Sequence, residues 1–219
     1  PINHLEGHVL SPTFNNNVEY PHLCFLLTGG HTQIYLNNEI GNYELLGQTL
    51  DDAIGEAFDK VAKLLNLSYP GGPIIEKNAI NGNISAYELP HPLKKNKNLN
   101  FSFSGIKTAV NLIIKKERKI DEIVIRNVSA SFQNVVANIL EEKLNLTMEL
   151  LKRKKIKISQ ISLVGGVAAN KYIFKRLQNV ANKNDCSLIL PENFMLSDNA
   201  AMIGWACIKK FSNNFTSDI

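Results

Sequence analysis

Short, continuous runs of hydrophobic residues mark the segments of this chain that we expect to form strands. Residues Leu23 to Leu36 read LCFLLTGGHTQIYL, two such runs joined by a glycine pair, which predicts a strand, a tight turn and a second strand. Two more runs, Ile161 to Gly166 and Cys186 to Leu190, predict buried strands nearer the C-terminus. The pattern therefore predicts four strands.

Between these runs the hydrophobic residues recur at helical spacing. The strongest pattern covers Gln48 to Leu67, where Thr49 or Asp51 is the expected cap. A proline–glycine turn, YPGGP at residues 69–73, is expected to stop this helix. Further helices are predicted over residues 107–119, 120 to about 154, 167–184 and 197–211. Strands that alternate with helices indicate an α/β fold.

Two boundaries follow from the same reading. The last predicted helix begins near Ser197 or Asp198, either of which could cap it. The loop from Leu89 to Gly105 carries prolines and lysines and is the best candidate for a boundary between two lobes.

Composition places the chain among ordinary globular proteins. Of its 219 residues, 44% are hydrophobic and 20% charged, and the formal net charge of +4 permits a nucleic-acid partner without requiring one. Lysine-rich runs at residues 94–97, 115–119 and 152–157 are read either as solvated helix ends or as contacts to an RNA backbone. No apolar run approaches the roughly 18 residues of a membrane span, so no membrane partner is expected.

The cysteines and the first residues bear on cellular context. Three cysteines lie far apart without a CxxC pair, which argues against a disulfide framework and against a cysteine zinc site, and favours a cytoplasmic location. The chain starts Pro-Ile-Asn, without an initiator methionine or a signal peptide, and we expect it to be a fragment.

The motif HLEGH at residues 4–8 places two histidines one helical turn apart, on the same face of a helix. This spacing suits two imidazoles on one metal ion. Zinc proteases need H-E-x-x-H, whereas Glu6 stands two residues from each histidine and would point away from both on a helix. A metal site and a pair of solvated histidines both stay open, while a protease base at Glu6 is disfavoured.

A third ligand is available in Asp198, within LSDNAAM just before the last predicted helix. The alternative role of such an aspartate is to cap that helix. Two histidines and one carboxylate would leave coordination positions open for a substrate and would suit Fe(II) or Zn(II).

The two glycine pairs suggest a place for a nucleotide. Gly29 and Gly30 stand at a strand-to-strand turn, where backbone N–H groups can receive phosphate oxygens. Gly165 and Gly166 stand between a strand and a helix, whose dipole favours anions. Neither pair matches the P-loop or the Rossmann fingerprint, so those two classes are disfavoured. Glycine pairs serve turns more often than ligands, and only their combination suggests a nucleotide between two lobes.

Seven strings, taken in order, carry a resemblance to a known family. They are NHLEGH, LLTGGHTQ, LDDAIGEAFDKVAKLLNLSYPGGP, FSFSGIKTAV, SASFQ, GGVAAN and SDNAAM. Over essentially all of its length the chain resembles the tRNA N6-adenosine threonylcarbamoyltransferases, the TsaD family, once described as O-sialoglycoprotein endopeptidases. The resemblance implies an actin/Hsp70/sugar-kinase-like (ASKHA) α/β fold with two lobes around a nucleotide cleft. It assigns residues 1–100 to the remainder of the first lobe with the start of the second-lobe core, and 101–219 to the second lobe with a helical insert and GGVAAN.

The resemblance also implies an activity. Family members are acyltransferases that move the threonylcarbamoyl group of threonylcarbamoyl-AMP to N6 of adenosine 37 in tRNAs that read ANN codons, and AMP leaves. The implied partners are tRNA, threonylcarbamoyl-AMP and TsaB-like and TsaE-like proteins. One divalent metal per subunit is implied, Fe(II) before Zn(II), and its ligands map onto His4, His8 and Asp198.

Substrate-contacting positions of the family map onto nine residues. In this reading Asp59 holds ribose hydroxyls and the metal acts as a Lewis acid on the carbamoyl group or the leaving phosphate. No residue is assigned as a general base. The nine positions are Leu26, Leu27, Thr28, Gly29, Gly30, Asp59, Gly72, Glu76 and Asn170.

The chain also departs from the family pattern. Thr28 stands where relatives usually have serine, and Ser197 where they usually have threonine, so both keep a hydroxyl. A GIETSCDDT-like segment and a GPGL loop, which family members carry before this point, are not found. The first lobe is therefore expected to be incomplete and the chain inactive or poorly folded alone. Two alternatives stay open, a non-enzymatic fragment that binds nucleotide or partner proteins and, less favoured, a metalloendopeptidase.

Overall fold

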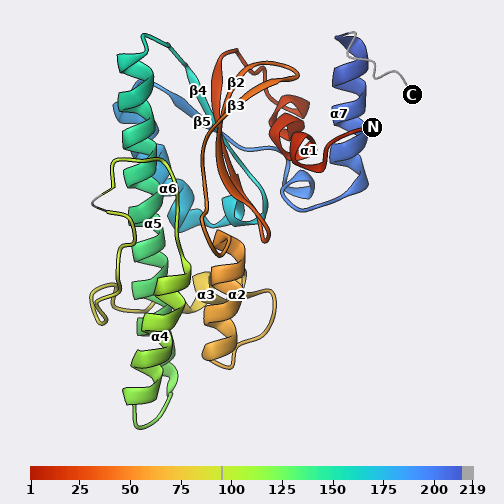
Figure 1. Ribbon diagram of the computed structural model, residues 1–219. Coiled ribbons are helices and arrows are strands. Elements are labelled where there is room, and N and C mark those ends of the chain that lie inside the picture. Colours follow the sequence, from red (N-terminus) through yellow and green to blue (C-terminus); the bar gives the residue numbers. More distant parts are fainter. Residues whose placement is uncertain (95, 214–219) are drawn as a thin grey trace.

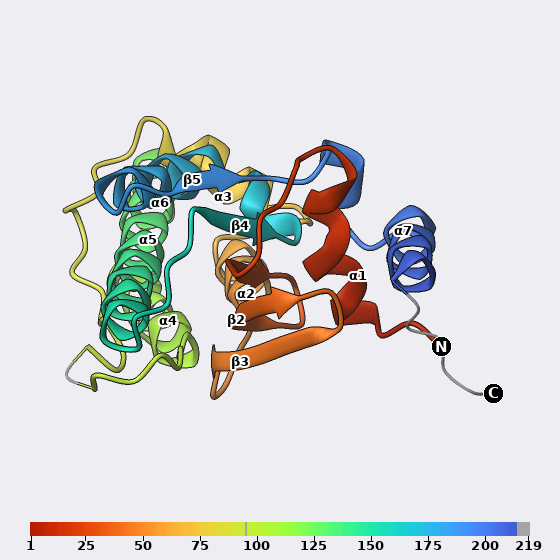
Figure 2. The same ribbon diagram turned by 90° about the horizontal axis from the view of Figure 1, so that it is seen from above.

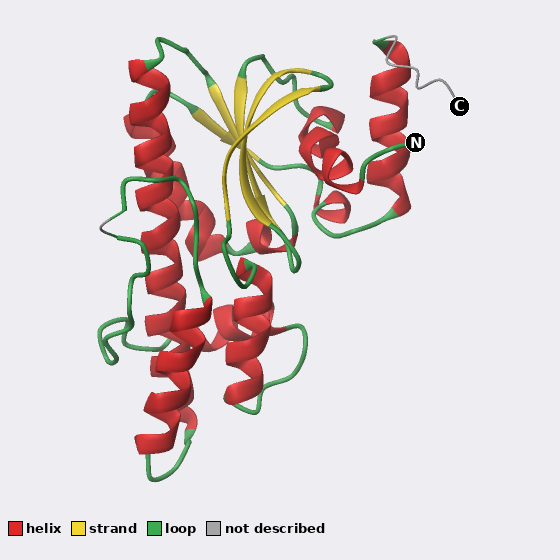
Figure 3. Ribbon diagram, viewed as in Figure 1, coloured by secondary structure: helices red, strands yellow, loops and turns green. Residues whose placement is uncertain are grey.

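A five-stranded mixed sheet forms the centre of the computed structural model, which describes residues 1–94 and 96–213 (Figures 1 and 3). The strands lie in the order β3-β2-β1-β4-β5. β1 pairs antiparallel with β2 and parallel with β4, and the outer pairs are β2 with β3, antiparallel, and β4 with β5, parallel. Their bounds are β1 His22–Leu27, β2 Thr32–Glu39, β3 Asn42–Gln48, β4 Gln160–Val164 and β5 Ser187–Ile189.

β1 occupies the middle of the sheet because both of its faces are apolar. All six of its residues are buried, as expected for a strand with packed layers on both sides. Leu23, Phe25 and Leu27 point into the main core. Cys24 and Leu26 point the other way, into a smaller cluster that α1 helps to cover.

Helices cover both faces of the sheet (Figures 1 and 2). The long helix α5 packs with α3, α4 and α6 on one side, and α1 packs with α7 on the other. The α-helices are α1 His4–Leu10, α2 Ile54–Leu64, α3 Gly71–Ala79, α4 Ser104–Lys116, α5 Glu122–Arg153, α6 Lys171–Lys183 and α7 Ala200–Ser212. Three short 3₁₀ turns are η1 Ser11–Phe14, η2 Gly166–Ala169 and η3 Asn193–Met195. Within the described residues no helix is both long enough and apolar enough to cross a membrane.

Two elements were absent from the sequence prediction. β3 is an edge strand with mostly exposed positions, so it lacks a continuous apolar run. α3 begins Gly-Gly-Pro, which reads as a turn, although proline is tolerated in the first turn of a helix because its missing N–H has no partner there.

The expected caps of two helices were wrong. α2 begins at Ile54 rather than at the start of the apolar pattern near Gln48, and Glu56 accepts a hydrogen bond from the N–H of its N-cap residue Ala53. α7 begins at Ala200 and is capped by Asn199, whose side-chain oxygen accepts from the N–H of Met202. Asp198 is therefore free of the capping role.

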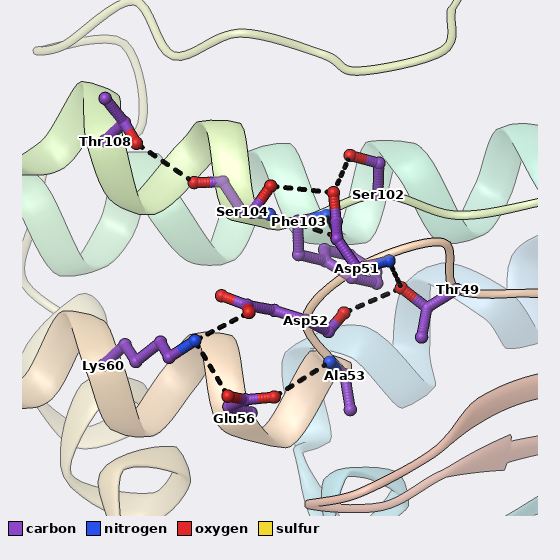
Figure 4. A network of polar contacts seen from close by, with 10 residues as sticks. All are labelled: Thr49, Asp51, Asp52, Ala53, Glu56, Lys60, Ser102, Phe103, Ser104 and Thr108. Atoms are coloured by element: carbon purple, nitrogen blue, oxygen red, sulfur yellow. Dashed lines mark hydrogen bonds and ion pairs between the residues drawn. The ribbon is translucent and has the colours of Figure 1, made fainter.

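Asp51, expected as a cap for α2, instead holds the start of α4 (Figure 4). Its carboxylate accepts hydrogen bonds from the hydroxyls of Ser102 and Ser104 and from the backbone N–H of Phe103, at 2.5–2.8 Å. Partial burial works to raise the pKa of Asp51, but these hydrogen bonds outweigh it and lower the pKa below its ordinary value. The FSFSG segment is thereby tied to the loop after β3.

The strands of the single sheet come from both sides of residue 100. β1 to β3 precede it, β4 and β5 follow it, and the parallel pairing of β1 with β4 joins the two segments. The division into lobes at this residue stays a prediction. Residue 95 of the lysine run at 94–97 and residues 214–219 of the second segment lie outside the described part of the chain.

Candidate functional site

Packing of α1 against α7 brings HLEGH to Asp198, two residues before the start of α7. Gly7 permits the close approach, because a Cβ at this position would lie 3.0 Å from Cδ1 of Ile203. His4 Nε2 lies 3.1 Å from one Asp198 oxygen, and His8 Nε2 lies 2.8 Å from the other. One ligand atom from each residue falls within 4.8 Å of the other two.

The three side chains differ in burial. His8 is fully buried, whereas 47% of the His4 side chain and 69% of the Asp198 side chain are exposed. Burial lowers the pKa of His8, although the hydrogen bond and the charge of Asp198 act in the opposite direction. The neutral imidazole is the form that binds a metal. Two nitrogen donors and one oxygen donor, open to solvent on one side, fit a divalent cation with free coordination positions.

Glu6 is occupied away from the histidines. Its buried carboxylate accepts from the hydroxyl of Tyr43 and pairs with Nζ of Lys210, both at 3.0 Å. This geometry agrees with the expectation that Glu6 points away from His4 and His8. The metalloendopeptidase alternative loses its base, because the only acid inside the motif links α1 to β3 and α7.

A cleft of about 350 Å³ opens beside this cluster. Ser197 lines the cleft and its neighbour Asp198 belongs to the histidine cluster, so the two features meet at one loop. Five of the nine predicted substrate positions line it: Gly29, Asp59, Gly72, Glu76 and Asn170. Two further lining residues were named from the sequence for other reasons, Gly166 in the second glycine pair and Ser197 as a position that keeps a hydroxyl. The remaining lining residues were not singled out: Gly55, Phe58, Tyr69, Pro70, Pro73, Val167 and Ala169.

Three polar residues of the cleft also hold its walls together. Asp59 Oδ1 accepts a hydrogen bond from the N–H of Gly71 at 2.7 Å, which ties α2 to α3. Glu76 Oε1 accepts from the N–H of Lys171 at 2.7 Å, which ties α3 to α6. Asn170 caps α6, with Oδ1 accepting from a backbone N–H 3.0 Å away.

Glycines shape the opposite wall. A Cβ on Gly55 would lie 2.8 Å from the Cα of Gly29, so only glycine lets the start of α2 close on the turn after β1. Gly165 has φ +91° and lies against the carbonyl of Leu27, which places the turn after β4 beside the turn after β1. Gly29 and Gly166 have open space around them, so backbone is accessible at both turns.

The other four predicted positions do not line the cleft. Leu26 and Leu27 are fully buried in β1 and belong to the two apolar clusters. Thr28 is buried too, and its hydroxyl accepts from the N–H of His31 at 2.9 Å, which closes the turn. Gly30 is exposed at the same turn. Any interaction of the two leucines with a substrate would have to use their backbone.

Tyr69 is the most informative residue that the sequence reading passed over. Its side chain lies at the rim of the cleft and is 82% exposed. The available signal was its place at the start of YPGGP, a segment whose sequence indicates only a helix stop.

Comparison with known proteins identifies the family of the chain. A family model described as "TsaD: tRNA N6-adenosine threonylcarbamoyltransferase" matches residues 1–205. Curated proteins with that description, from Rickettsia massiliae (strain Mtu5) and Wolbachia pipientis wMel, are 43% and 42% identical over 97% and 98% of the chain. The chain spans 62% and 63% of their length.

Two solved structures share the fold at low identity. "Crystal structure of full-length HypF in the phosphate- and nucleotide-bound form" has a TM-score of 0.68 at 14% identity, over 95% of this chain and 35% of that one. "Activator of the 2-Hydroxyisocaproyl-CoA Dehydratase from Clostridium difficile with bound ADPNP" has a TM-score of 0.51 at 15% identity, over 100% and 71%. These likenesses confirm the predicted ASKHA-like α/β fold. The family model matches residues 1–205, which is most of the chain, so the chain belongs to the tRNA N6-adenosine threonylcarbamoyltransferase family.

Proposed function

We propose that this protein transfers a threonylcarbamoyl group from threonylcarbamoyl-AMP to N6 of adenosine 37 in tRNAs that read ANN codons. The observation that carries the proposal is the junction at Ser197 and Asp198, where the convergent donors of His4, His8 and Asp198 meet a cleft lined by glycine turns. An adenylate ester needs both features, a surface of backbone amides for its phosphate and a positive centre near its acyl carbon.

The metal is part of the proposal. His4, His8 and Asp198 would hold one divalent ion, Fe(II) before Zn(II), because their donors converge and His8 is kept neutral by burial. When bound, the ion would supply Lewis-acid polarisation of the carbamoyl group or of the leaving phosphate.

The chain's own residues would bind and align the substrate. The backbone at Gly29 and Gly166 is uncrowded and can approach a phosphate. Asp59 uses one oxygen to hold Gly71 and has a second that can accept from a ribose hydroxyl. Glu76 and Asn170 fix the far wall through α6.

In the transfer, the adenosine amine bonds to the carbamoyl carbon, the bond from that carbon to the phosphate oxygen breaks, and the amine proton leaves with AMP or water. The amine is a weak nucleophile, so alignment and electrostatic stabilisation supply much of the rate. No residue is assigned as a general base.

Partners and location complete the proposal. The protein would act in the cytoplasm on tRNA, together with TsaB-like and TsaE-like proteins. Support comes from membership of a family whose description names tRNA as the substrate.

The test is a modification assay. The protein is incubated with tRNA, threonylcarbamoyl-AMP, the divalent metal and the two partner proteins, and the digested tRNA is examined by mass spectrometry. We expect threonylcarbamoyladenosine, and its loss in Asp198→Ala. The positive control is the Rickettsia massiliae relative in the same mixture. If the relative gives product while this protein gives none, the proposal is wrong and a non-catalytic binding role replaces it.

A further inference from the structure

Tyr69 stands on a ridge between the cleft and a second hollow. The second hollow has a volume of about 300 Å³ and shares Asp59 and Tyr69 with the cleft. Asp59 belongs to α2, and Tyr69 belongs to the loop that connects α2 to α3 (Figure 1). A side chain that borders two hollows and is 82% exposed offers its ring to a ligand on either side.

The second hollow combines apolar surface with one available cation. Ala62, Leu67 and the Tyr69 ring contribute apolar walls. Lys60 is also present, but its Nζ is neutralised by Asp52 at 2.6 Å and by Glu56 at 2.8 Å. Lys63 is exposed and, among residues 1–94 and 96–213, has no carboxylate within 4.0 Å.

The backbone beside Tyr69 is held firmly. The N–H of Gly71 donates to Asp59 at 2.7 Å. A Cβ on Gly71 would lie 2.6 Å from the carbonyl oxygen of Phe58, so this turn packs directly on α2. The ring therefore projects from a fixed base, which lowers the entropy lost when a ligand stacks on it.

These features fit a nucleobase and its phosphate. A planar base can stack on the tyrosine ring against the apolar wall, and Lys63 can meet the phosphate that follows. A macromolecular substrate whose reacting nucleotide enters the cleft must place its neighbouring nucleotides on the rim. Bases of a single-stranded loop are free to splay out and stack on aromatic side chains.

We infer that Tyr69 and the adjoining hollow bind a nucleotide that flanks the acceptor adenosine, with the base on the tyrosine ring and the phosphate near Lys63. This inference rests on the proposed function. It makes Tyr69 a binding residue for the RNA and not for the adenylate donor.

The experiment separates the two substrates. Dissociation constants for an anticodon stem-loop RNA and for threonylcarbamoyl-AMP are measured with the wild-type protein and with Tyr69→Ala, Tyr69→Phe and Lys63→Gln. A stacked base contributes about 1–3 kcal/mol, or about 5- to 150-fold. We expect Tyr69→Ala to weaken RNA binding about tenfold or more, Tyr69→Phe to restore it, and donor binding to change less than twofold.

The control is Phe211→Ala, which removes another exposed ring (74%) from α7. An RNA whose flanking nucleotide is abasic should bind wild type and Tyr69→Ala equally. The inference falls if Tyr69→Ala binds RNA like wild type, or if RNA and donor binding weaken together. Because these readouts are binding constants, a protein that stacks the RNA but makes no product in the modification assay would overturn the proposed function alone.

Discussion

At the residue scale, two buried histidines of this chain have different surroundings and therefore different chemistry. His8 faces a carboxylate and a second imidazole, and burial lowers its pKa, which favours the neutral form that can bind a cation. His22 is buried in β1, where its Nε2 lies 2.9 Å from the side-chain amide nitrogen of Asn37. The same residue type thus belongs to a candidate metal site in one place and to the core in the other.

The first prediction concerns the cation cluster. His8→Ala removes one of two nitrogen donors and should lower bound metal from about one ion per chain to a small fraction, measured by elemental analysis after loading with Fe(II) or Zn(II). His91→Ala, which changes a histidine paired with Glu142, should keep full occupancy. Full occupancy in His8→Ala would rule out the assigned ligands.

The second prediction concerns pH. Burial lowers the pKa of His22 to about 4, against an ordinary value near 6.5. The unfolded chain therefore takes up this proton first as the pH falls. The neutral His22 contributes up to about 3 kcal/mol to the free energy of unfolding. This contribution is fully present above about pH 6.5 and is lost as the pH falls from there to about 4.

His22→Gln should remove this share of the acid sensitivity. We expect the free energy of unfolding in urea to fall less in the variant than in wild type between about pH 7.5 and about pH 4.5. The buried His8 is present in both proteins, so its effect cancels. An equal fall in both would show that His22 is not the group responsible.

At the element scale, Asp51 joins two segments that the sequence places far apart. Its carboxylate takes the hydrogen bonds at the start of α4, a role like that of an N-cap from another element (Figure 4). α4 in turn packs on α2, which forms one wall of the cleft. The loss of one carboxylate should therefore loosen a helix that supports the site.

Asp51→Asn should cost about 1–2 kcal/mol of unfolding free energy, since the neutral amide accepts these hydrogen bonds more weakly. The neighbouring Asp52→Asn removes the same charge but breaks an ion pair with Lys60, and we expect a loss of at most about 1 kcal/mol. Thermal or urea unfolding measures both. A smaller loss in Asp51→Asn than in Asp52→Asn would contradict the role given to the α4 start.

At the scale of the whole molecule, two basic runs lie at opposite ends of α5. Residues 115–119 cover the end of α4 and the start of the connection to α5, whereas residues 152–157 run from the last residues of α5 toward β4. The 32 residues of α5 span about 48 Å. The carboxyl ends of the parallel strands β1 and β4 lead into the glycine turns at the cleft. The second run precedes β4, so it lies near the amino ends of these strands, away from the cleft (Figure 1). Only the first run points to the side of the cleft.

RNA binding should distinguish the two runs. Replacing Lys115, Lys116 and Lys119 by glutamine should weaken tRNA binding and reduce the slope of log K against log salt, by up to about 0.9 for each phosphate that the lysines no longer neutralise. The same change at Lys152, Lys155 and Lys157 should leave that slope unchanged. Equal slopes in both variants, or a reduction only in the second, would place the RNA elsewhere.

Sequence patterns predicted the interiors of most elements and missed their ends. Apolar spacing is a local property, so β1, β2, α5 and α6 were found from it. Helix ends depend on polar contacts that apolar spacing does not reveal. Asp51 binds the start of α4 from a distant part of the chain, and Asn199 rather than Ser197 or Asp198 caps α7. In the site, HLEGH was visible from spacing, and Asp198 was a plausible partner. Tyr69 was missed because its position beside two hollows is a tertiary property, which the YPGGP turn alone does not reveal.

The sequence by itself determined that His4 and His8 share one face of a helix and that glycine pairs follow two buried strands. These are consequences of helical and strand periodicity, which set the direction of each side chain within one element. Only the tertiary structure decided that Asp198 completes the cluster, 190 residues after His8, because α1 must bury its apolar face against α7. It also decided that the two glycine turns share one cleft, since parallel pairing of β1 with β4 brings their carboxyl ends to the same edge of the sheet.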